Sequence, residues 1–362
     1  MKTRPLLSET MAAHGVSRRT FMKYCATLAS VMALPPALAP RIAQALERAR
    51  RPSVIWLSFQ ECTGCTESIT RSHAPTIEEM IFNTISLDYQ DTLQAAAGHQ
   101  AEAARHQAMK ENYGKYLVVV EGSIPVANPA YSCFAGRSNL DVLKETAAGA
   151  AAIVTVGTCA AYGGIPHAMP NPTGARAVSD IITDKPIINV PGCPPIPVVM
   201  TGVLAHFLTF GVPELDDLGR PKAFYGDVIH DRCYRRPFYD KGLFAETFDD
   251  EGARAGWCLY KLGCKGPTTH SVCATVKWNG GVSFPIQSGH PCLGCTQPDF
   301  WDGGGFYKPL SVPTGDYRAL AAGGVGVGAV VGAAGALVGR GVKAEAARKH
   351  ETVDAHDLEK PS

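Results

Sequence analysis

The sequence predicts an α/β protein in which a parallel-sheet domain is followed by a smaller, irregular domain. Short apolar runs alternate with helical stretches in the first half of the chain, an order typical of a parallel sheet covered on both faces. Strand-like runs become scarce near residue 226, where Cys, Gly, Pro and aromatic residues increase. The length of 362 residues suits two domains better than one.

Residues 1–45 are predicted to be a twin-arginine export signal. The string Ser-Arg-Arg-Thr-Phe-Met-Lys at 17–23 precedes a mildly apolar run at 24–38, and this combination marks the bacterial twin-arginine route. The alternative is the basic start of an amphipathic helix. We expect Ala45 to be the last residue of the signal, so that Cys25 is lost on maturation.

Four apolar runs predict buried strands of the sheet, at residues 53–59, 116–121, 151–156 and 186–190. Helices are expected between them, around 77–83 and 139–148. Ligands of such sheets bind at the carboxyl ends of the strands. Four residues of chemical interest fall at those ends: Cys62, Glu121, Cys159 and Cys193.

We place the domain boundary near residue 225, which gives a first domain at 46–225 and a second at 226–310. The second domain can bury little apolar surface by itself. It therefore requires cross-links, which bound metal clusters would supply.

An uncharged segment at 319–339 predicts a transmembrane anchor. At about 1.5 Å per residue it is just long enough for a bilayer core of roughly 30 Å. Basic residues follow it, which predicts a cytoplasmic tail at 340–362. Because the segment consists mostly of Gly, Ala and Val, a flexible low-complexity tail is the alternative.

The cysteines carry the strongest functional signal. The formal net charge of +1 offers no sign of a basic stripe for nucleic acid, but twelve cysteines exceed what packing requires. Two Cys-x-x-Cys pairs, 62/65 and 292/295, each place two sulfurs on one turn, within reach of one metal or cluster. Neighbouring glycines and prolines free the backbone to wrap around such a site.

Disulfides and zinc are the two other uses of these cysteines. A disulfide framework fits poorly, because loss of Cys25 leaves an odd number, eleven of the twelve. Zinc suits sites of four cysteines, or of three cysteines and a histidine, equally well. The spacing differs from the short, regular pairs of zinc ribbons, but spacing alone leaves zinc open.

Several strings resemble the small subunit of membrane-bound, periplasm-facing nickel–iron hydrogenases. They are Glu-Cys-Thr-Gly-Cys-Thr-Glu-Ser (61–68), Val-Glu-Gly-Ser-Ile-Pro (120–125), Gly-Thr-Cys-Ala (157–160), Pro-Gly-Cys-Pro-Pro (191–195) and Gly-His-Pro-Cys-Leu-Gly-Cys-Thr-Gln-Pro-Asp-Phe-Trp-Asp (289–302). They occur in the right order from about residue 53 to 302, and both terminal segments resemble those of the same group.

The resemblance implies a flavodoxin-like first domain, an irregular iron–sulfur domain, and three clusters, two [4Fe-4S] and one [3Fe-4S]. It assigns a proximal [4Fe-4S] cluster to Cys62, Cys65, Cys159 and Cys193. It assigns a medial [3Fe-4S] cluster to Cys273, Cys292 and Cys295. It assigns a distal [4Fe-4S] cluster to His230, Cys233, Cys258 and Cys264.

These assignments leave Cys133, which we expect to be a small buried side chain. Pro285 is expected at the missing fourth corner of the medial cluster. A neutral imidazole in place of a thiolate should raise the reduction potential of the distal cluster.

The implied function is electron transfer. A separate large subunit would split dihydrogen at its nickel–iron site, and this chain would carry the electrons to a b-type cytochrome or another quinone-linked protein of the inner membrane. No catalytic residue is expected here, and the body would face the periplasm. The alternative is a stand-alone multi-cluster electron carrier without a catalytic partner.

Two finer expectations concern the proximal cluster. Some oxygen-tolerant members of the family carry two extra cysteines, at positions that match Gly64 and Gly164 here, so we predict an ordinary four-cysteine cluster. Glu67 and Glu121 lie near the proximal ligands. We interpret them as acceptors of structural hydrogen bonds rather than as proton carriers.

Overall fold

A computed structural model describes residues 16–32, 34–48, 51–303 and 305–310, which belong to one compact unit. The predicted anchor at 319–339 and the predicted tail at 340–362 lie outside these residues, as does the start of the predicted signal. Within the described ranges, no helix is both long enough and apolar enough to cross a membrane.

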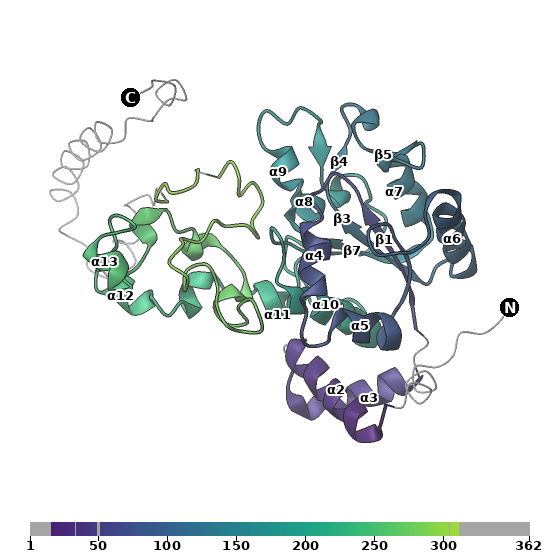
Figure 1. Ribbon diagram of the computed structural model, residues 1–362, viewed down its shortest axis with the longest axis horizontal. Coiled ribbons are helices and arrows are strands. Elements are labelled where there is room, and N and C mark those ends of the chain that lie inside the picture. Colours follow the sequence, from purple (N-terminus) through teal and green to yellow (C-terminus); the bar gives the residue numbers. More distant parts are fainter. Residues whose placement is uncertain (1–15, 33, 49–50, 304, 311–362) are drawn as a thin grey trace, which may run out of the picture. The chain divides into compact units, whose positions relative to one another are not determined.

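A five-stranded parallel sheet forms the centre of the protein, with strand order β2-β1-β3-β7-β9 (Figure 1). The strands are β1 (Ser53–Ser58), β2 (Ser86–Gln90), β3 (Tyr116–Glu121), β7 (Ala150–Val156) and β9 (Ile187–Val190). Numbered along the chain, these strands have the order 2-1-3-4-5, which is that of the flavodoxin-like doubly wound fold. The four strands predicted from apolar runs are confirmed, and β2 is an addition.

Each face of the sheet buries its own apolar core, because successive side chains of a strand point to opposite faces. Val54, Trp56 and Val119 face one core, whereas Ile55 and Val118 face the other. Complete burial of one such side chain contributes roughly 1.5–3 kcal/mol. Continuous runs of β-branched residues therefore suit strands that are covered on both sides.

Helices cover both faces of the sheet. They are α4 (Gly64–Thr70), α5 (Ile77–Glu79) with the π-helical turn η2 (Met80–Thr84), α6 (Gly98–Glu111), α7 (Asn139–Ala148), α8 (Thr158–Tyr162), α9 (Gly164–His167) and α10 (Pro197–Phe210). The predicted helix at 139–148 is confirmed, and the Ser138 hydroxyl caps it by accepting from the N–H of Asp141 at 3.2 Å. Helix α10 is apolar on all sides, as expected of a helix buried in a core.

Short elements connect the main ones. Two-residue strands pair as β4 (Ile124–Pro125) with β8 (Ala175–Arg176) and as β5 (Cys133–Phe134) with β6 (Arg137–Ser138); single 3₁₀ turns are η3 (Pro129–Tyr131) and η4 (Val178–Asp180). The expectation that Cys133 is buried is wrong, because its side chain is exposed. In the same short strand, Phe134 turns inward and stacks on Phe59 and Tyr89, so the alternation of the strand turns Cys133 to solvent.

From residue 222 to 310 the described chain contains only short helices and loops. They are α11 (Lys222–Tyr225), η5 (Ile229–Arg232), α12 (Arg236–Asp240), α13 (Glu251–Arg254), η6 (Tyr260–Leu262), η7 (Gly266–Thr268) and η8 (Val272–Ala274). Their small core contains Ile229, Leu259 and Phe284 together with several of the predicted sulfur ligands. The boundary near residue 225 stays a prediction.

The described part of the predicted signal forms α2 (Arg18–Val31), η1 (Pro36–Leu38) and α3 (Ala39–Arg48). Ser17 caps α2 by accepting from the N–H of Thr20 at 3.2 Å. Apolar side chains of both helices, including Leu28 and Ile42, pack together with Ala205 of α10. Cleavage after Ala45 stays a prediction.

Candidate functional site

The proximal set (Cys62, Cys65, Cys159 and Cys193) lies at the carboxyl edge of the parallel sheet. Cys62 lies in the loop after β1 and Cys65 in the first turn of α4, Cys159 lies in α8 directly after β7, and Cys193 lies in the loop after β9. Parallel strands end at the same edge of the sheet (Figure 1), so the segments that carry these four cysteines lie close to one another.

The four sulfurs influence one another electrostatically. Burial raises the pKa of the Cys65 thiol, and further contributions come from Glu121 and from the other three cysteines of the set. Burial likewise raises the pKa of Cys193 to about 12, with neighbouring cysteine sulfurs adding to the effect. A group of buried thiols disfavours the thiolate form unless positive charge is supplied, as a bound metal centre does. This donor set therefore fits a thiolate-ligated metal group.

Two glycines let the backbone pass directly against these sulfurs. A Cβ on Gly157 (φ +89°) would lie 2.4 Å from Cys65 Sγ, and one on Gly164 (φ +58°) would lie 2.6 Å from Cys159 Sγ. Both backbone conformations also favour glycine. The loops thus form a close cradle that a side chain at either position would obstruct.

Glu121, at the end of β3, fixes the first turn of α4. Its carboxylate is buried and accepts from the backbone N–H of Cys65 at 2.9 Å and of Thr66 at 3.1 Å. The indole N–H of Trp56 donates to the same carboxylate at 3.3 Å. Glu67 instead pairs at the surface with Arg71 at 2.6 Å. These contacts give Glu121 the structural role expected from the sequence.

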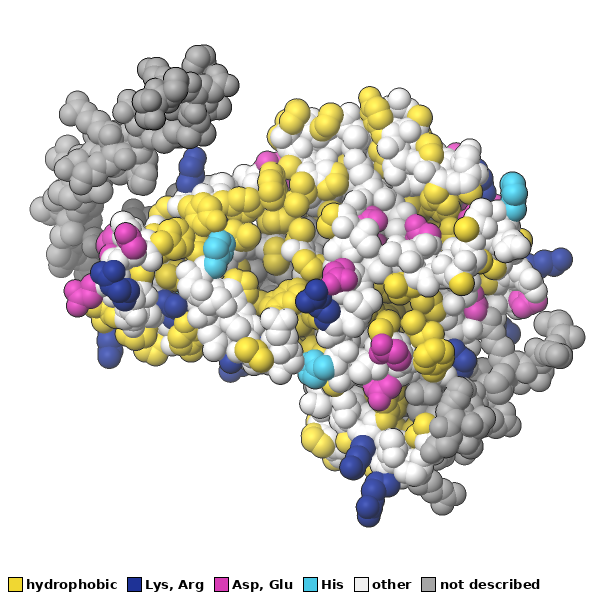
Figure 2. Space-filling model, in the orientation of Figure 1, with side chains coloured by type: hydrophobic (Ala, Val, Ile, Leu, Met, Phe, Trp, Pro, Cys, Tyr) yellow, Lys and Arg dark blue, Asp and Glu magenta, His cyan; other side chains and the backbone are white. Residues whose placement is uncertain are grey.

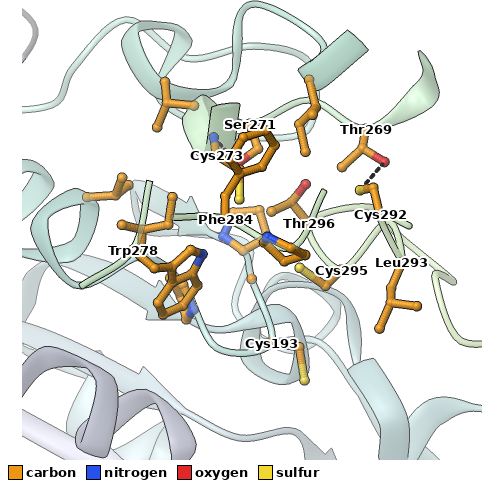
Figure 3. Close-up of a pocket in the computed structure, with 18 of the residues that line it drawn as sticks. Cys193, Thr269, Ser271, Cys273, Trp278, Phe284, Cys292, Leu293, Cys295 and Thr296 are labelled. Atoms are coloured by element: carbon orange, nitrogen blue, oxygen red, sulfur yellow. Dashed lines mark hydrogen bonds between the residues drawn. The ribbon is translucent and has the colours of Figure 1, made fainter. Parts of the chain in front are cut away.

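The medial set (Cys273, Cys292 and Cys295) lines a cavity of about 170 Å³. Figure 3 shows Cys273 and Cys295 directed at this space, with Phe284 and Trp278 on one side and Cys193 of the proximal set below. Burial raises the pKa of Cys273 to about 12, with Cys295 adding to it. The sulfur of Cys292 interacts with Thr269 Oγ1 at 3.6 Å.

The walls of this cavity are largely apolar, and Pro285 is among the residues that line it. Pro285 thus lines the same cavity as the three medial cysteines, and its position at the missing fourth corner stays a prediction. Apolar walls exclude water and lower the local dielectric, which are two of the properties by which a protein tunes a bound cluster.

The distal set (His230, Cys233, Cys258 and Cys264) lies among the short helices after β9. Burial raises the pKa of Cys258 to about 11, and Cys264 and Cys233 contribute to this shift. A Cβ on Gly266 would lie 3.4 Å from Cys264 Sγ and 3.8 Å from the backbone nitrogen of His230. The structure therefore brings the three sulfurs together, with the backbone of His230 close to Cys264.

The surroundings of His230 favour the neutral form of its imidazole ring. Its ring packs edge-on against Tyr239, with the centroids 4.5 Å apart. Burial, followed by the charge of Arg236, lowers the pKa of the imidazole. The neutral ring is the form that binds metals.

The three sets are linked in a row. Cys193 of the proximal set also lines the medial cavity, and Cys295 contributes to the raised pKa of Cys193. Thr158, next to Cys159, donates from its hydroxyl to the carbonyl of Cys295. At the other side, the N–H of Cys292 donates to Cys264 Sγ of the distal set at 3.4 Å. The order proximal, medial, distal is therefore a property of the fold.

The geometry of the cysteines bears on their two alternative uses. All twelve cysteines are free thiols, and all of them lie in the described ranges. Within the described ranges, no group of three or more His, Cys, Asp or Glu side chains is arranged to hold one metal ion. An iron–sulfur cluster makes a different demand, because its ligands bind separate metal atoms of a larger inorganic core.

Sequence reasoning missed three residues that the structure places against the sets. Thr158 joins the loops after β7 and β9, because the N–H of Gly192 donates to its hydroxyl at 2.9 Å. Arg235 and Lys265 are buried cations beside the distal set. Their closeness in sequence to Cys233 and Cys264 could have pointed to them. Burial was not expected, because Arg and Lys side chains are usually at the surface.

Family models match two parts of the chain. Residues 225–308 match the C-terminal family of the NiFe/NiFeSe hydrogenase small subunit. Residues 62–207 match the family of the NADH ubiquinone oxidoreductase, 20 Kd subunit. Together the matches cover the proximal set and the segment that carries the medial and distal sets.

Individual relatives are similar over most of the chain. An uptake hydrogenase small subunit of Azotobacter vinelandii is 52% identical over 305 residues, which cover 84% of this chain and 85% of the relative. A hydrogenase-1 small chain of Citrobacter freundii is 52% identical, covering 83% and 80%. Among solved structures, a reduced, active Ni-Fe-Se hydrogenase of Desulfomicrobium baculatum is 38% identical, with a TM-score of 0.67 and coverage of 72% and 100%.

Proposed function

The chain belongs to the small subunits of NiFe uptake hydrogenases, and on this premise we propose that it carries electrons through three iron–sulfur clusters held in a row. Members of this family bind iron–sulfur clusters and work with a hydrogenase large subunit, which makes the chain part of an oxidoreductase. The proposal extends this to the type of each cluster and to its ligands.

We assign one cluster to each set of donors. The proximal set of four cysteines would hold a [4Fe-4S] cluster, the medial set of three a [3Fe-4S] cluster, and the distal set of three cysteines and His230 a second [4Fe-4S] cluster. One observation supports the arrangement in a row: Cys193 lines the same cavity as the medial set, and the N–H of Cys292 donates to Cys264 Sγ of the distal set. When bound, each cluster supplies a one-electron carrier.

The residues around the sets have definable tasks. The cysteines provide thiolates, and the neutral His230 provides an uncharged nitrogen. Pro285 lines the medial cavity without offering a donor, which agrees with a three-ligand site. Phe284 and Trp278 keep water from that site. Glu121 holds the first turn of α4, so that Cys62 and Cys65 stay at the sheet edge.

The large subunit would cover the proximal end. Cys62 is exposed there, and beyond Cys159 the chain presents Ile165, 42% exposed, and Met169, 78% exposed. Figure 2 shows hydrophobic side chains along the upper edge of the molecule, over α9. Apolar groups around an exposed cluster ligand are suited to burial in an obligate interface.

The body would be exported and held at the inner membrane. The twin arginines at the start of α2, the segment at 319–339 and the basic tail after it support this location. A b-type cytochrome or another quinone-linked membrane protein would then accept the electrons near the distal set.

Absorption and electron paramagnetic resonance (EPR) spectra of the anaerobically purified protein test the proposal. We expect a brown protein that shows a three-iron signal and co-purifies with a nickel-containing partner. Cys273→Ser should remove the three-iron signal and leave the signals of the other clusters. A colourless protein that contains zinc would overturn the assignment.

A further inference from the structure

The buried cations of this protein fall into two classes. In the described part of the chain, the buried arginine and lysine side chains are Arg105, Arg220, Arg235 and Lys265. The first two pair with carboxylates, Arg105 with Glu102 at 2.7 Å and Arg220 with Asp216 at 2.7 Å. The other two have no carboxylate partner among the described residues. Both of them lie beside the distal set.

Arg235 is 5% exposed and is held by uncharged groups. Its Nη1 donates to the carbonyl of Trp257 at 2.6 Å, and its Nε donates to the hydroxyl of Tyr234 at 2.7 Å. The guanidinium carbon also lies 5.4 Å from the centre of the Tyr234 ring. These contacts fix its position, but none of them comes from an anion.

The distal thiols are the neighbouring groups that can become anionic. Cys233 lies two residues before Arg235, and the Trp257 carbonyl that accepts from Arg235 Nη1 directly precedes Cys258. An unpaired buried charge is strongly destabilising, so its persistence here implies a partner that becomes negative when the site is filled.

We propose that Arg235 is the fixed counter-ion of the distal donor set and raises the reduction potential of the cluster bound there. The inference rests on the proposed function. An arginine keeps its charge, and a buried positive charge stabilises the more negative, reduced state of a neighbouring cluster. Lys265 lies next to Cys264, with Nζ donating to the carbonyl of Lys308 at 2.8 Å, and adds to the same field.

The buried charges beside the two end sets favour one direction of electron flow. In the described part of the chain, the buried charged side chain beside the proximal set is the carboxylate of Glu121, whereas the buried charged side chains beside the distal set are the cations Arg235 and Lys265. Fixed charges of this arrangement lower the energy of an electron at the distal end relative to the proximal end. Arg235 thereby favours flow away from the large subunit, which is the direction of hydrogen uptake.

The test compares Arg235→Gln with Arg235→Lys and Arg232→Gln in the purified heterodimer, using EPR-monitored redox titrations. Arg232 is the matched control, because its side chain is 63% exposed and pairs with Asp227 at 2.9 Å. Arg235→Gln should lower the midpoint potential of the distal cluster by about 59 mV. For a one-electron carrier this shift corresponds to a tenfold change in the ratio of reduced to oxidised cluster. Arg235→Lys should restore most of the shift, and Arg232→Gln should change little because water and salt screen its charge.

An unchanged distal potential in Arg235→Gln with full cluster content would overturn the inference and leave the proposed function intact. If Arg235→Gln loses the distal cluster, Arg235→Lys decides. A retained cluster with nearly normal potential supports the counter-ion role, whereas loss in both variants shows that the forked geometry, not the charge, is required. Absence of all cluster signals from the unaltered protein would instead refute the proposed function.

Discussion

The proximal and distal sets differ in what holds their donors in place. The proximal cysteines extend from the ends of β1, β7 and β9, and these strands are anchored in two apolar cores. Three of the distal donors lie on loops and His230 lies in the four-residue helix η5, in a region whose small core includes Cys233 and Cys264 themselves. The first site is therefore supported by the sheet, whereas the second forms part of the core that must support it.

This difference predicts different responses to the loss of the cofactors. Short helices are unstable alone, and bound metal contributes directly to the folding of such segments. The distal region should depend on its metal for order, and the sheet should not.

Removal of the clusters should have the largest effect. After anaerobic chelation of the heterodimer, we expect amide hydrogens of residues 229–292 to lose most of their protection from exchange, while those of β3 and β7 stay protected. Hydrogen exchange read by mass spectrometry measures both regions in one sample. Equal loss of protection in the two regions would show that the sheet also depends on the cofactors.

Breaking the anchor of α4 should come next. Glu121→Ala removes the acceptor of two backbone N–H groups and of the Trp56 indole. Buried donors left without partners each cost about 1–3 kcal/mol, so we expect the free energy of unfolding to fall by about 3 kcal/mol. Urea unfolding followed by far-ultraviolet circular dichroism measures this change.

Glu67→Ala is the control for the same segment. Glu67 lies two residues from Cys65 but is exposed, and among the described residues its carboxylate pairs only with Arg71. An exposed pair of this kind contributes about 0–1 kcal/mol. Similar losses in both variants would mean that the buried hydrogen bonds of Glu121 do not support the proximal loop.

The two regions also differ in how far the sequence revealed them. Runs of Val and Ile placed β1, β3, β7 and β9 to within a residue or two, because continuous burial leaves a continuous apolar signature. Strand β2 was missed, since its Ser-Leu-Asp-Tyr-Gln sequence lies at the sheet edge and is only partly buried. Helix α10 was missed for the opposite reason, because uniform apolarity removes the helical period.

At the sites, candidate donors could be named from the sequence, but their surroundings could not. Cysteine spacing and family resemblance supplied eleven candidate donors, whose role stays a prediction, and parallel topology explains why the loops that carry Cys62, Cys159 and Cys193 meet. Arg235 gave no sign of burial, because its contacts with Trp257 and Tyr234 depend on how the short helices pack. The exposure of Cys133 likewise depends on the orientation of the short hairpin formed by β5 and β6, which the sequence does not reveal.

A smaller effect concerns the close approach of backbone to sulfur in the proximal cradle. At Gly164, the positive φ and a Cβ only 2.7 Å from Cys159 Cα should make alanine unfavourable by about 2 kcal/mol. At Gly64, a Cβ would meet only Cys62 Sγ, at 3.1 Å. We expect Gly164→Ala to lower the occupancy of the proximal cluster and Gly64→Ala to retain it, as measured by iron content and EPR.

The outcome bears on the prediction of an ordinary four-cysteine proximal cluster, which rests on the glycines at positions 64 and 164. Because Gly164 approaches the Cys159 backbone so closely, a side chain there requires the α8–α9 turn to move. If Gly164→Ala keeps full occupancy, the cradle adapts more easily than its geometry indicates, and the contrast between a rigid proximal site and a dependent distal site weakens.

The smallest effect should be a response to acid within the sheet region. His206 lies in α10, where its ring packs against Phe210 with centroids 5.4 Å apart. Burial lowers the pKa of His206 from its ordinary 6.5, and the contact of Nδ1 with the carbonyl of Gly211 opposes this only in part. The folded protein therefore binds fewer protons at this residue than the unfolded chain does.

Because the unfolded state binds more protons, stability should rise with pH across the range where the two states differ. On acidification, the loss should begin as the pH falls below 6.5, the value for the unfolded chain, and should level off below the lowered pKa of the folded state. His206→Gln removes the titration and should flatten that part of the curve of unfolding free energy against pH. An equally steep curve in His206→Gln would place the acid-sensitive group elsewhere, and local exchange in α10 would then show no special dependence on pH.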